Sequence, residues 1–190
     1  MNVHVPPERI ELEPWRFTVR DVERMVASGI LAEDDRVELI EGRLVRMAPK
    51  GNDHEGVKDP LVTRLARSLP ERLLVSVETT LRLSSSTVVE PDLLVYDGAR
   101  GRAGLNTASA LLVVEIAVST LRFDLGPKAD LYAAHGVREL WVVDVAGRRT
   151  VVHRAPGSER YDEVSEHTFD VPLTPHLVPE VTLKLSEIAP

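Results

Sequence analysis

The chain has 190 residues, 43% of them hydrophobic, and is therefore long enough to bury one core of ordinary size. It contains no cysteine, which excludes disulfides, thiolate zinc sites and cysteine nucleophiles. Its 23 basic and 30 acidic residues give a net charge of −7, which argues against a generally basic nucleic-acid binder but leaves room for a local basic groove.

Composition also bears on the compartment. No apolar run approaches the roughly 20 residues of a membrane span, and residues 1–14 are too charged and too rich in proline for a signal peptide. We therefore expect a cytoplasmic protein without membrane contact. The absence of Gln and the presence of only three Asn are typical of proteins from organisms that grow at high temperature. The excess of Arg over Lys does not decide the point, because a GC-rich genome also favours Arg.

Residues 1–16 are predicted to form an extended arm because three prolines interrupt them. A helix is expected next, since Thr18 is a suitable N-cap, Asp21 can complete a capping box and Gly29 can end the helix. The apolar side chains expected to face the core from it are Val19, Val22, Met25 and Val26.

Two short apolar runs, residues 37–40 and 44–47, predict a tight hairpin around Glu41 and Gly42. The hairpin carries Glu38 within its first strand. Taken alone, a strand acid of this kind is most simply a solvated residue.

A second helix is expected to begin near Asp59 and Pro60, or at Asp53 with a kink. His54 lies close to that start, where a lone histidine is usually a surface residue. The side chains at four-residue spacing that predict its buried face are Val57, Leu61, Leu65 and Leu69. Its basic side chains could meet phosphate, although a solvated face is the simpler interpretation; they are Lys58, Arg64 and Arg67.

Residues 73–83 alternate in a way that predicts one long strand, and the serines at 84–86 turn the chain back. Residues 97–110 are rich in glycine and small side chains and predict a mobile connection. Arg100 and Arg102 within it could close over DNA phosphates, with plain solvent exposure as the alternative.

Two acids inside buried strands are the most informative feature of the chain. Residues 90–95 and 111–116 are short apolar runs of the kind found in central strands, yet the first contains Asp92 and the second Glu115. A buried carboxylate costs several kcal/mol unless a cation compensates it. A divalent metal held between the two acids would supply that compensation.

A lysine completes this set. After Glu115 the chain is predicted to enter a helix with Asp124 as N-cap and Pro127 in its first turn. One face of that helix carries Lys128, Leu131, Tyr132 and His135. Because the chain has only 4 lysines against 19 arginines, an inward lysine suggests a specific task. Two carboxylates, a metal and an ammonium group form a plausible site for activating water against a phosphodiester.

The remaining residues predict further strands. Residues 140–145 and 150–153 form a hairpin, and residues 161–169 and 181–185 are strand-like. The segment 156–190 is interrupted by prolines and is expected to be an irregular β appendage that ends in a short helix or tail.

The two acidic segments resemble a known group of enzymes. Pro91 with Asp92, followed by Glu115 in an apolar strand, is similar to the acidic motifs of the PD-(D/E)XK nuclease superfamily. The order and spacing of the segments more closely resemble the Uma-type restriction endonuclease family, a former domain of unknown function, over residues 17–144. The matching positions are residues 17–19, residues 37–47, His54, Asp92, Glu115, Asp124, Lys128, Tyr132 and residues 136–144.

This resemblance implies an α/β or α+β fold, with a restriction-endonuclease-like core in which helices flank a mixed central sheet. We expect an arm at residues 1–16, a nuclease-like domain at 17–155 and the appendage 156–190 packed on that same domain. The superfamily lysine usually lies two residues after the second acid, where this chain has Ala117. The Uma-type family places it on the following helix, which Lys128 fits.

The implied function is a metal-dependent endonuclease that hydrolyses DNA. Asp92, Glu115 and the backbone carbonyl of Ile116 would hold Mg²⁺ or Mn²⁺, with Glu38 as a further ligand or second-metal partner. Lys128 would position the attacking water and stabilise the phosphate, and His54 would orient substrate or metal. A homodimer is expected by analogy with nucleases that cut two strands, and no organic cofactor is expected.

Two alternatives remain. The first is a binding or regulatory module that keeps the nuclease fold without turnover, suggested by the apolar Ala117 and Val118 after Glu115 and by the acidic total. The second is a structural homo-oligomeric protein, in which arginines would pair with Asp92 and Glu115 and leave no space between them.

Overall fold

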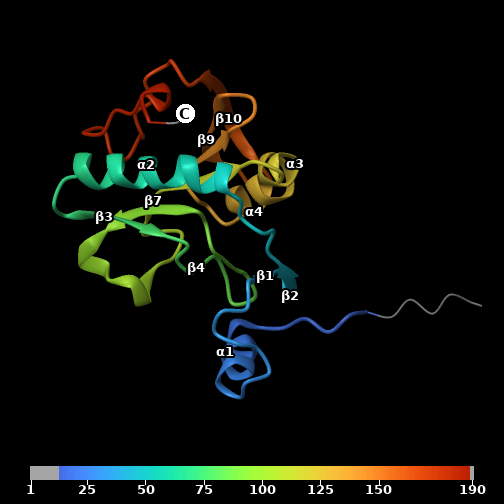
Figure 1. Ribbon diagram of the computed structural model, residues 1–190. Coiled ribbons are helices and arrows are strands. Elements are labelled where there is room, and N and C mark those ends of the chain that lie inside the picture. The colour runs from blue at the N-terminus through green and yellow to red at the C-terminus, as the bar shows by residue number, and fades with distance from the viewer. Residues whose placement is uncertain (1–12, 189–190) are drawn as a thin grey trace, which may run out of the picture.

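The computed structural model describes residues 13–188, so the predicted arm over residues 1–16 lies largely outside the described part. A six-stranded sheet lies at the centre, a four-stranded sheet lies beside it, and helices pack against the central sheet (Figure 1). The predicted α/β class with a mixed sheet flanked by helices is confirmed.

The large sheet has the strand order β10-β9-β8-β7-β6-β3. Its central pair, β7 and β8, is parallel, and every other neighbouring pair is antiparallel. A parallel pair needs a crossover, which the chain makes through a helical segment. The strands are β3 (Leu73–Val77), β6 (Leu93–Asp97), β7 (Ala110–Ala117), β8 (Glu139–Asp144), β9 (Arg149–Pro156) and β10 (Tyr161–Thr168).

The crossover contains α3 (Leu121–Phe123), the π-helical turn η3 (Asp124–Lys128) and α4 (Ala129–Ala134). The prediction that Asp124 begins the helix is wrong, because Asp124 caps the end of α3 and accepts a hydrogen bond from Thr120 Oγ1. Pro127 has no N–H to donate and the backbone of Gly126 is not helical, so the chain makes a wider turn before α4.

The small sheet has the order β2-β1-β5-β4 and contains the predicted hairpin. Its turn residues Glu41 and Gly42 both have positive φ, 48° and 77°, as tight hairpin turns require. The strands are β1 (Val37–Ile40), β2 (Arg43–Arg46), β4 (Leu81–Arg82) and β5 (Val88–Val89).

The prediction of one long strand over residues 73–83 is wrong. β3 ends at Val77 in the large sheet, whereas β4 begins at Leu81 in the small one. Glu78 between them has φ 45°, which takes the chain out of the extended line, and its N–H donates to the carbonyl of Asp92 at 3.2 Å. The alternating pattern therefore continues across two sheets.

Helix α2 (Asn52–Ser68) begins with Gly51 as N-cap, within one residue of the predicted alternative start at Asp53. The other predicted start, near Asp59 and Pro60, is wrong, because Pro60 lies inside the helix. Three of the side chains predicted for its inner face are buried: Val57, Leu61 and Leu65. Lys58 is buried as well and is not on a solvated face.

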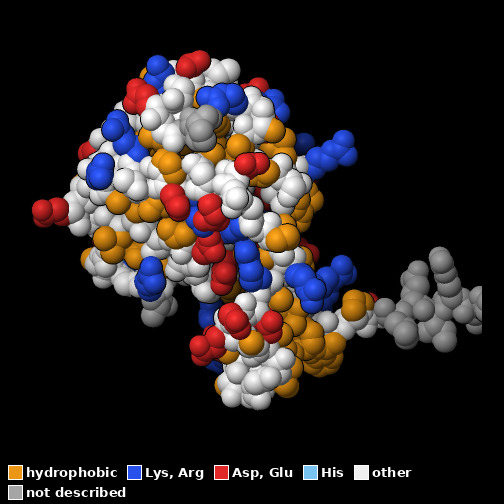
Figure 2. Space-filling model, viewed as in Figure 1, with side chains coloured by type: hydrophobic (Ala, Val, Ile, Leu, Met, Phe, Trp, Pro, Cys, Tyr) orange, Lys and Arg blue, Asp and Glu red, His pale blue; other side chains and the backbone are white. Residues whose placement is uncertain are grey.

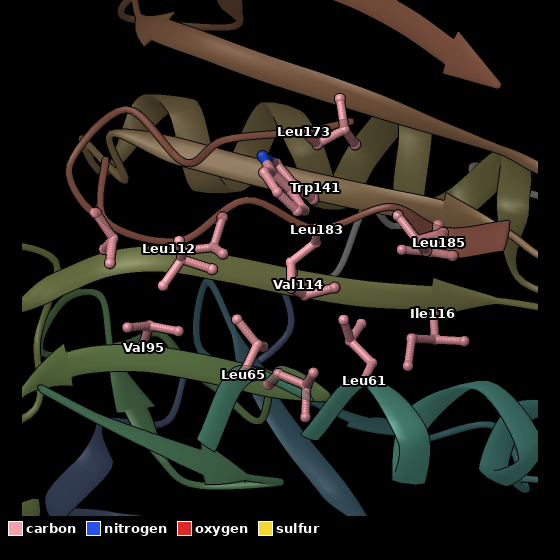
Figure 3. Packing of buried hydrophobic residues seen from close by; sticks show 14 of the residues in the cluster. Leu61, Leu65, Val95, Leu112, Val114, Ile116, Trp141, Leu173, Leu183 and Leu185 are labelled. Atoms are coloured by element: carbon pink, nitrogen blue, oxygen red, sulfur yellow. The ribbon is translucent and has the colours of Figure 1, made fainter. Parts of the chain in front are cut away.

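The main core lies between α2, one face of the large sheet and the C-terminal segment (Figure 3). Along β7, Leu112, Val114 and Ile116 point into this core, whereas Val113 and Ala117 pack on the opposite face with α4. Since strand side chains alternate, Glu115 shares the face of Val113 and Ala117. The order of residues in β7 therefore turns Glu115 toward the crossover helices.

The C-terminal segment contributes to this same core. Its buried members are Phe169, Leu173, Val178, Val181, Leu183 and Leu185. The predicted strand over residues 181–185 is reduced to a single bridge between Leu173 and Leu183, followed by the 3-10 turn η4 (Leu185–Glu187). The prolines in this segment remove backbone donors, which limits regular pairing.

Helix α1 (Val19–Ala27) has the predicted capping box between Thr18 and Asp21. It lies on a lobe that projects from the body (Figure 1), and Figure 2 shows hydrophobic side chains gathered on this lobe. Of the side chains predicted to face inward, only Val19 is buried; Val22, Met25 and Val26 are half-buried. No helix within residues 13–188 has the length and apolar character needed to cross a membrane.

Candidate active site

A cavity of about 500 Å³ lies where the small sheet, the start of α2 and the end of β7 meet. Its walls carry an unusual density of charged groups. The acidic side chains that line it are Glu38, Glu90, Asp92, Glu115 and Asp124. The other predicted site residues that line it are Ile116, Lys128 and His54, and it also contains Lys50.

The register of the sheet brings Asp92 next to Glu115. β6 begins at Leu93, which pairs with Val114 of β7. Because the two strands are antiparallel, Asp92 before Leu93 lies opposite Glu115 after Val114. Because β6 has not yet begun there, the Ile116 N–H lacks a strand partner and donates instead to Asp92 Oδ2 at 2.7 Å. Asp92 thus caps the open end of the β6 ladder.

Both oxygens of Asp92 have cationic or donor partners. Lys50 Nζ lies 2.6 Å from Oδ1, and His54 Nε2 lies 3.0 Å from Oδ2, while the other ring nitrogen of His54 contacts Glu55 at 3.2 Å. Burial disfavours the charged carboxylate, but the His54 hydrogen bond and the Lys50 charge outweigh it and lower the pKa of Asp92 to about 2. Asp92 is therefore ionised at neutral pH.

Glu115 is held by two donors on one oxygen. Tyr132 O–H donates to Glu115 Oε1 at 2.6 Å, and Lys128 Nζ lies 2.9 Å from the same atom. Burial, together with the charges of Asp92 and other acids, raises the pKa of Glu115 although Lys128 opposes the rise. An added cation at this point would relieve the concentration of negative charge.

Glu38 reaches the same group of side chains from β1 in the small sheet. Its Oε1 accepts from the Glu90 N–H at 3.1 Å and lies 3.4 Å from Lys128 Nζ. Burial disfavours the ammonium group of Lys128, but Glu115 and Glu38 outweigh this and raise its pKa. Glu38 is therefore buried at the cavity, and the simpler interpretation of a solvated strand acid does not hold.

Arg100 and Arg102 are not brought to the cavity. They lie in the 3-10 turns η1 (Gly98–Arg100) and η2 (Arg102–Gly104), beyond the opposite end of β6 from Asp92. Five strand residues span about 17 Å. Arg102 instead lies near the sheet edge, where it donates to Ser76 Oγ at 3.4 Å.

Sequence reasoning missed Lys50 and Glu78, and it gave Lys58 a solvated face or a phosphate contact and not a contact with acids. Lys50 Nζ is 3.0 Å from Glu78 Oε1, and Lys58 pairs with Glu55 and Glu78. The scarcity of lysine, which drew attention to Lys128, would have selected Lys50 and Lys58 as well. Three of the four lysines in the chain therefore contact acids in or beside this cavity.

The donor set fits a hard divalent cation. In the part of the chain that the structure describes, no three His, Asp or Glu side chains are already grouped as metal ligands, and the lysines lie between the acids. The carboxylates are nevertheless oxygen donors of the kind that Mg²⁺ and Mn²⁺ prefer. The N–H and C=O of an extended residue point to the same side, so the Ile116 carbonyl also faces the open end of β6.

In the described part of the chain, two other buried acids, Glu139 and Asp144, have arginine partners, unlike Asp92 and Glu115. Glu139 is fully buried, and Arg154 donates to its Oε1 from two nitrogens at 2.7 and 3.0 Å. Asp144 is likewise paired with Arg149. Neither Asp92 nor Glu115 has an arginine partner among the described contacts, and a cavity lies beside them. This geometry does not support the purely structural alternative.

Comparison with known proteins agrees with this geometry. The family model described as "Uma2: Putative restriction endonuclease" matches residues 20–186. The chain belongs to the Uma2 family. The predicted relationship to Uma-type endonucleases is thereby confirmed, and the match extends past residue 144 through β9, β10 and the C-terminal core segment.

A solved structure shares the fold of this Uma2 protein. The crystal structure of a putative nuclease belonging to DUF820 from Anabaena variabilis ATCC 29413 superposes with a TM-score of 0.72. The alignment covers 90% of this chain and 97% of the other at 17% sequence identity, a level that establishes the fold. A search of the curated proteins finds no match.

Proposed function

We propose that this Uma2 protein is a divalent-metal-dependent endonuclease that hydrolyses phosphodiester bonds in DNA. The observation that carries the proposal is the convergence of Asp92, Glu115 and Lys128, from three separate segments, in one cavity. Adjacent carboxylates that can hold a metal, with an ammonium group beside them, suit metal-assisted hydrolysis of a phosphodiester.

Mg²⁺ or Mn²⁺, when bound, would supply Lewis-acid stabilisation of the phosphate and a more acidic bound water. Asp92, Glu115 and the Ile116 carbonyl would hold the ion, with Glu38 as a further ligand. His54 and Tyr132 would keep the two acids oriented, because they contact Asp92 Oδ2 and Glu115 Oε1 at 3.0 and 2.6 Å.

Lys128 has the role of a fixed positive charge. Its raised pKa keeps the ammonium group protonated at neutral pH, so it is unsuited to act as a general base. It would instead hold the attacking water and stabilise negative charge on the phosphate. Its two carboxylate contacts, from Glu115 and Glu38, restrict where that charge can lie.

DNA as the substrate and a homodimeric assembly are further parts of the proposal. The family description supports a nuclease that acts on DNA. A two-fold symmetric pair of chains would provide one such cavity for each strand of a duplex.

The test is a cleavage assay on supercoiled plasmid and on circular single-stranded DNA with Mg²⁺ or Mn²⁺. The wild type is expected to nick or linearise the DNA, and Asp92→Asn to leave it intact. Asp130→Asn is the matched control, since it removes the same charge from an exposed position on α4 outside the cavity. Cleavage by Asp92→Asn at the wild-type rate would refute the assignment.

A second candidate is a nuclease-fold module without turnover. Two observations favour it: Ala117 stands where the superfamily has its usual lysine, and Lys50 and Lys128 already neutralise the acids. Calorimetry with Mn²⁺ discriminates between the two. Binding heat that disappears in Asp92→Asn supports the enzyme, whereas no heat in either protein supports the module.

A further inference from the structure

The ammonium group of Lys50 lies where a metal ion bound to Asp92 would lie. Its ammonium nitrogen lies 2.6 Å from Asp92 Oδ1, the oxygen that accepts from neither His54 nor Ile116. Its side chain is only 13% exposed. A metal ligated through Oδ1 would have to take the place that this ammonium group now fills.

Lys50 also has a second partner to which it can move. Glu78 Oε1 lies 3.0 Å from the same nitrogen and belongs to the kinked segment between β3 and β4. The Glu78 side chain is 34% exposed and is not one of the residues that line the cavity. A small rotation of the lysine side chain would release Asp92 while keeping the ion pair with Glu78.

The two lysines beside the acid pair differ in their freedom to move. Lys128 belongs to η3, between two helices, and its ammonium group lies between buried Glu115 and buried Glu38. Lys50 belongs to the stretch 47–51 between β2 and α2, which has no regular structure and is mostly exposed. Lys50 is therefore the cation that can be displaced without disturbing a helix.

We propose that Lys50 and a divalent ion bind Asp92 in alternation, so that the carboxylate contacts either the ammonium group or the ion. Lys50 is then a positioning residue, and its competition sets the ion concentration at which the metal site is half occupied. The inference rests on the metal centre proposed above. While Lys50 contacts Asp92, the carboxylate stays ionised and keeps its orientation toward the cavity. With an ion on Asp92, Lys50 pairs with Glu78 alone.

The first test is Mn²⁺ binding measured by calorimetry. Lys50→Met keeps the length of the side chain and removes its charge, and is expected to tighten Mn²⁺ binding by about 10- to 100-fold, the range over which groups beside metal ligands act. Lys58→Met is the matched control, since it removes one charge from the same cluster but contacts Glu55 and Glu78, not Asp92. Its Mn²⁺ affinity should remain within a few-fold of wild type, and Lys50→Arg should restore affinity toward that of the wild type.

The second test measures where Lys50 lies. The chain has only four lysines, so acylation of each can be followed by mass spectrometry. Saturating Mn²⁺ should increase labelling of Lys50 several-fold relative to Lys184, with Lys128 staying protected.

The outcomes separate this inference from the proposed function. Equal Mn²⁺ affinity in wild type and Lys50→Met, or weaker binding in the variant, overturns the alternation and leaves the metal centre standing. Labelling of Lys50 that Mn²⁺ does not change also overturns it. Absence of Mn²⁺ binding in both wild type and a folded Lys50→Met, checked by circular dichroism, overturns the metal centre and the inference together.

Discussion

Lys128 Nζ lies 2.9 Å from Glu115 Oε1, and both side chains are buried. The two residues come from the crossover turn and from β7, and each compensates the charge of the other. In the proposed reaction the ammonium group is needed at the phosphate, while the carboxylate is needed at the metal. Substitution of Lys128 should therefore affect cleavage of the phosphodiester, whereas substitution of Glu115 should affect metal binding.

Lys128→Met is expected to lower the cleavage rate by at least about 100-fold, since one well-placed charge in a buried site acts on this scale. The affinity for DNA should change only a few-fold, because a DNA-binding protein makes most of its phosphate contacts away from the phosphate that is cleaved. Cleavage kinetics and a DNA-binding titration check the two parts. Lys184→Met is the control, and full cleavage by Lys128→Met would contradict the role given to this lysine.

Tyr132→Phe removes the hydroxyl that donates to Glu115 Oε1 at 2.6 Å and leaves the packed ring in place. Loss of an orienting contact to a ligand typically weakens metal binding by about 10- to 100-fold. We expect weaker Mn²⁺ binding in calorimetry with the fold retained. Tyr161→Phe is the control, since Tyr161 donates to the Val137 carbonyl outside the cavity. Unchanged Mn²⁺ affinity in Tyr132→Phe would argue against Glu115 as a ligand.

The stability of the protein should depend on the ionisation of Asp92. Its pKa is lowered from 3.8 to about 2, so the folded chain holds the charged form more favourably than the unfolded chain does. A group of this kind stabilises the fold above pH 3.8, and the contribution is lost as the pH falls toward 2. Its size at neutral pH is about 2 kcal/mol.

Urea unfolding of wild type and Asp92→Asn, with chelator present, tests this at several pH values. The difference in the free energy of unfolding should be greatest between pH 5 and 7 and should shrink below pH 4. A difference that is constant between pH 7 and pH 3 would show that Lys50 and His54 do not stabilise the carboxylate.

Arg154→Ala should destabilise the fold without a direct effect on the cavity. It leaves Glu139 buried without its cation, although Trp141 Nε1 and the His176 N–H still donate to it. Breaking a buried pair from one side costs about 3 to 5 kcal/mol. Urea unfolding measures the loss, with Arg64→Ala as an exposed control. A loss below about 1 kcal/mol would show that these two donors alone satisfy Glu139.

Several features of this protein could be derived from short stretches of sequence. The capping box of Thr18 and Asp21, the hairpin turn at Glu41 and Gly42, and the buried strand that contains Glu115 were predicted and are observed. The strand predicted over residues 90–95 begins only at Leu93, so Asp92 lies just before it. Each depends on neighbours within a few residues, because caps, turns and strand alternation are local properties of the backbone. The resemblance of the acidic segments to nucleases then indicated that the two acids and Lys128 would meet.

Other features were decided only when distant segments packed together. The kink at Glu78 divides an apparently continuous strand, and its N–H donates to the carbonyl of Asp92 in a distant segment. The contact of Lys50 with Asp92 joins residues 42 positions apart. The scarcity of lysine could have drawn attention to Lys50, but no local pattern identifies its partners, since its environment is set by charges that only the tertiary structure brings within 3 Å.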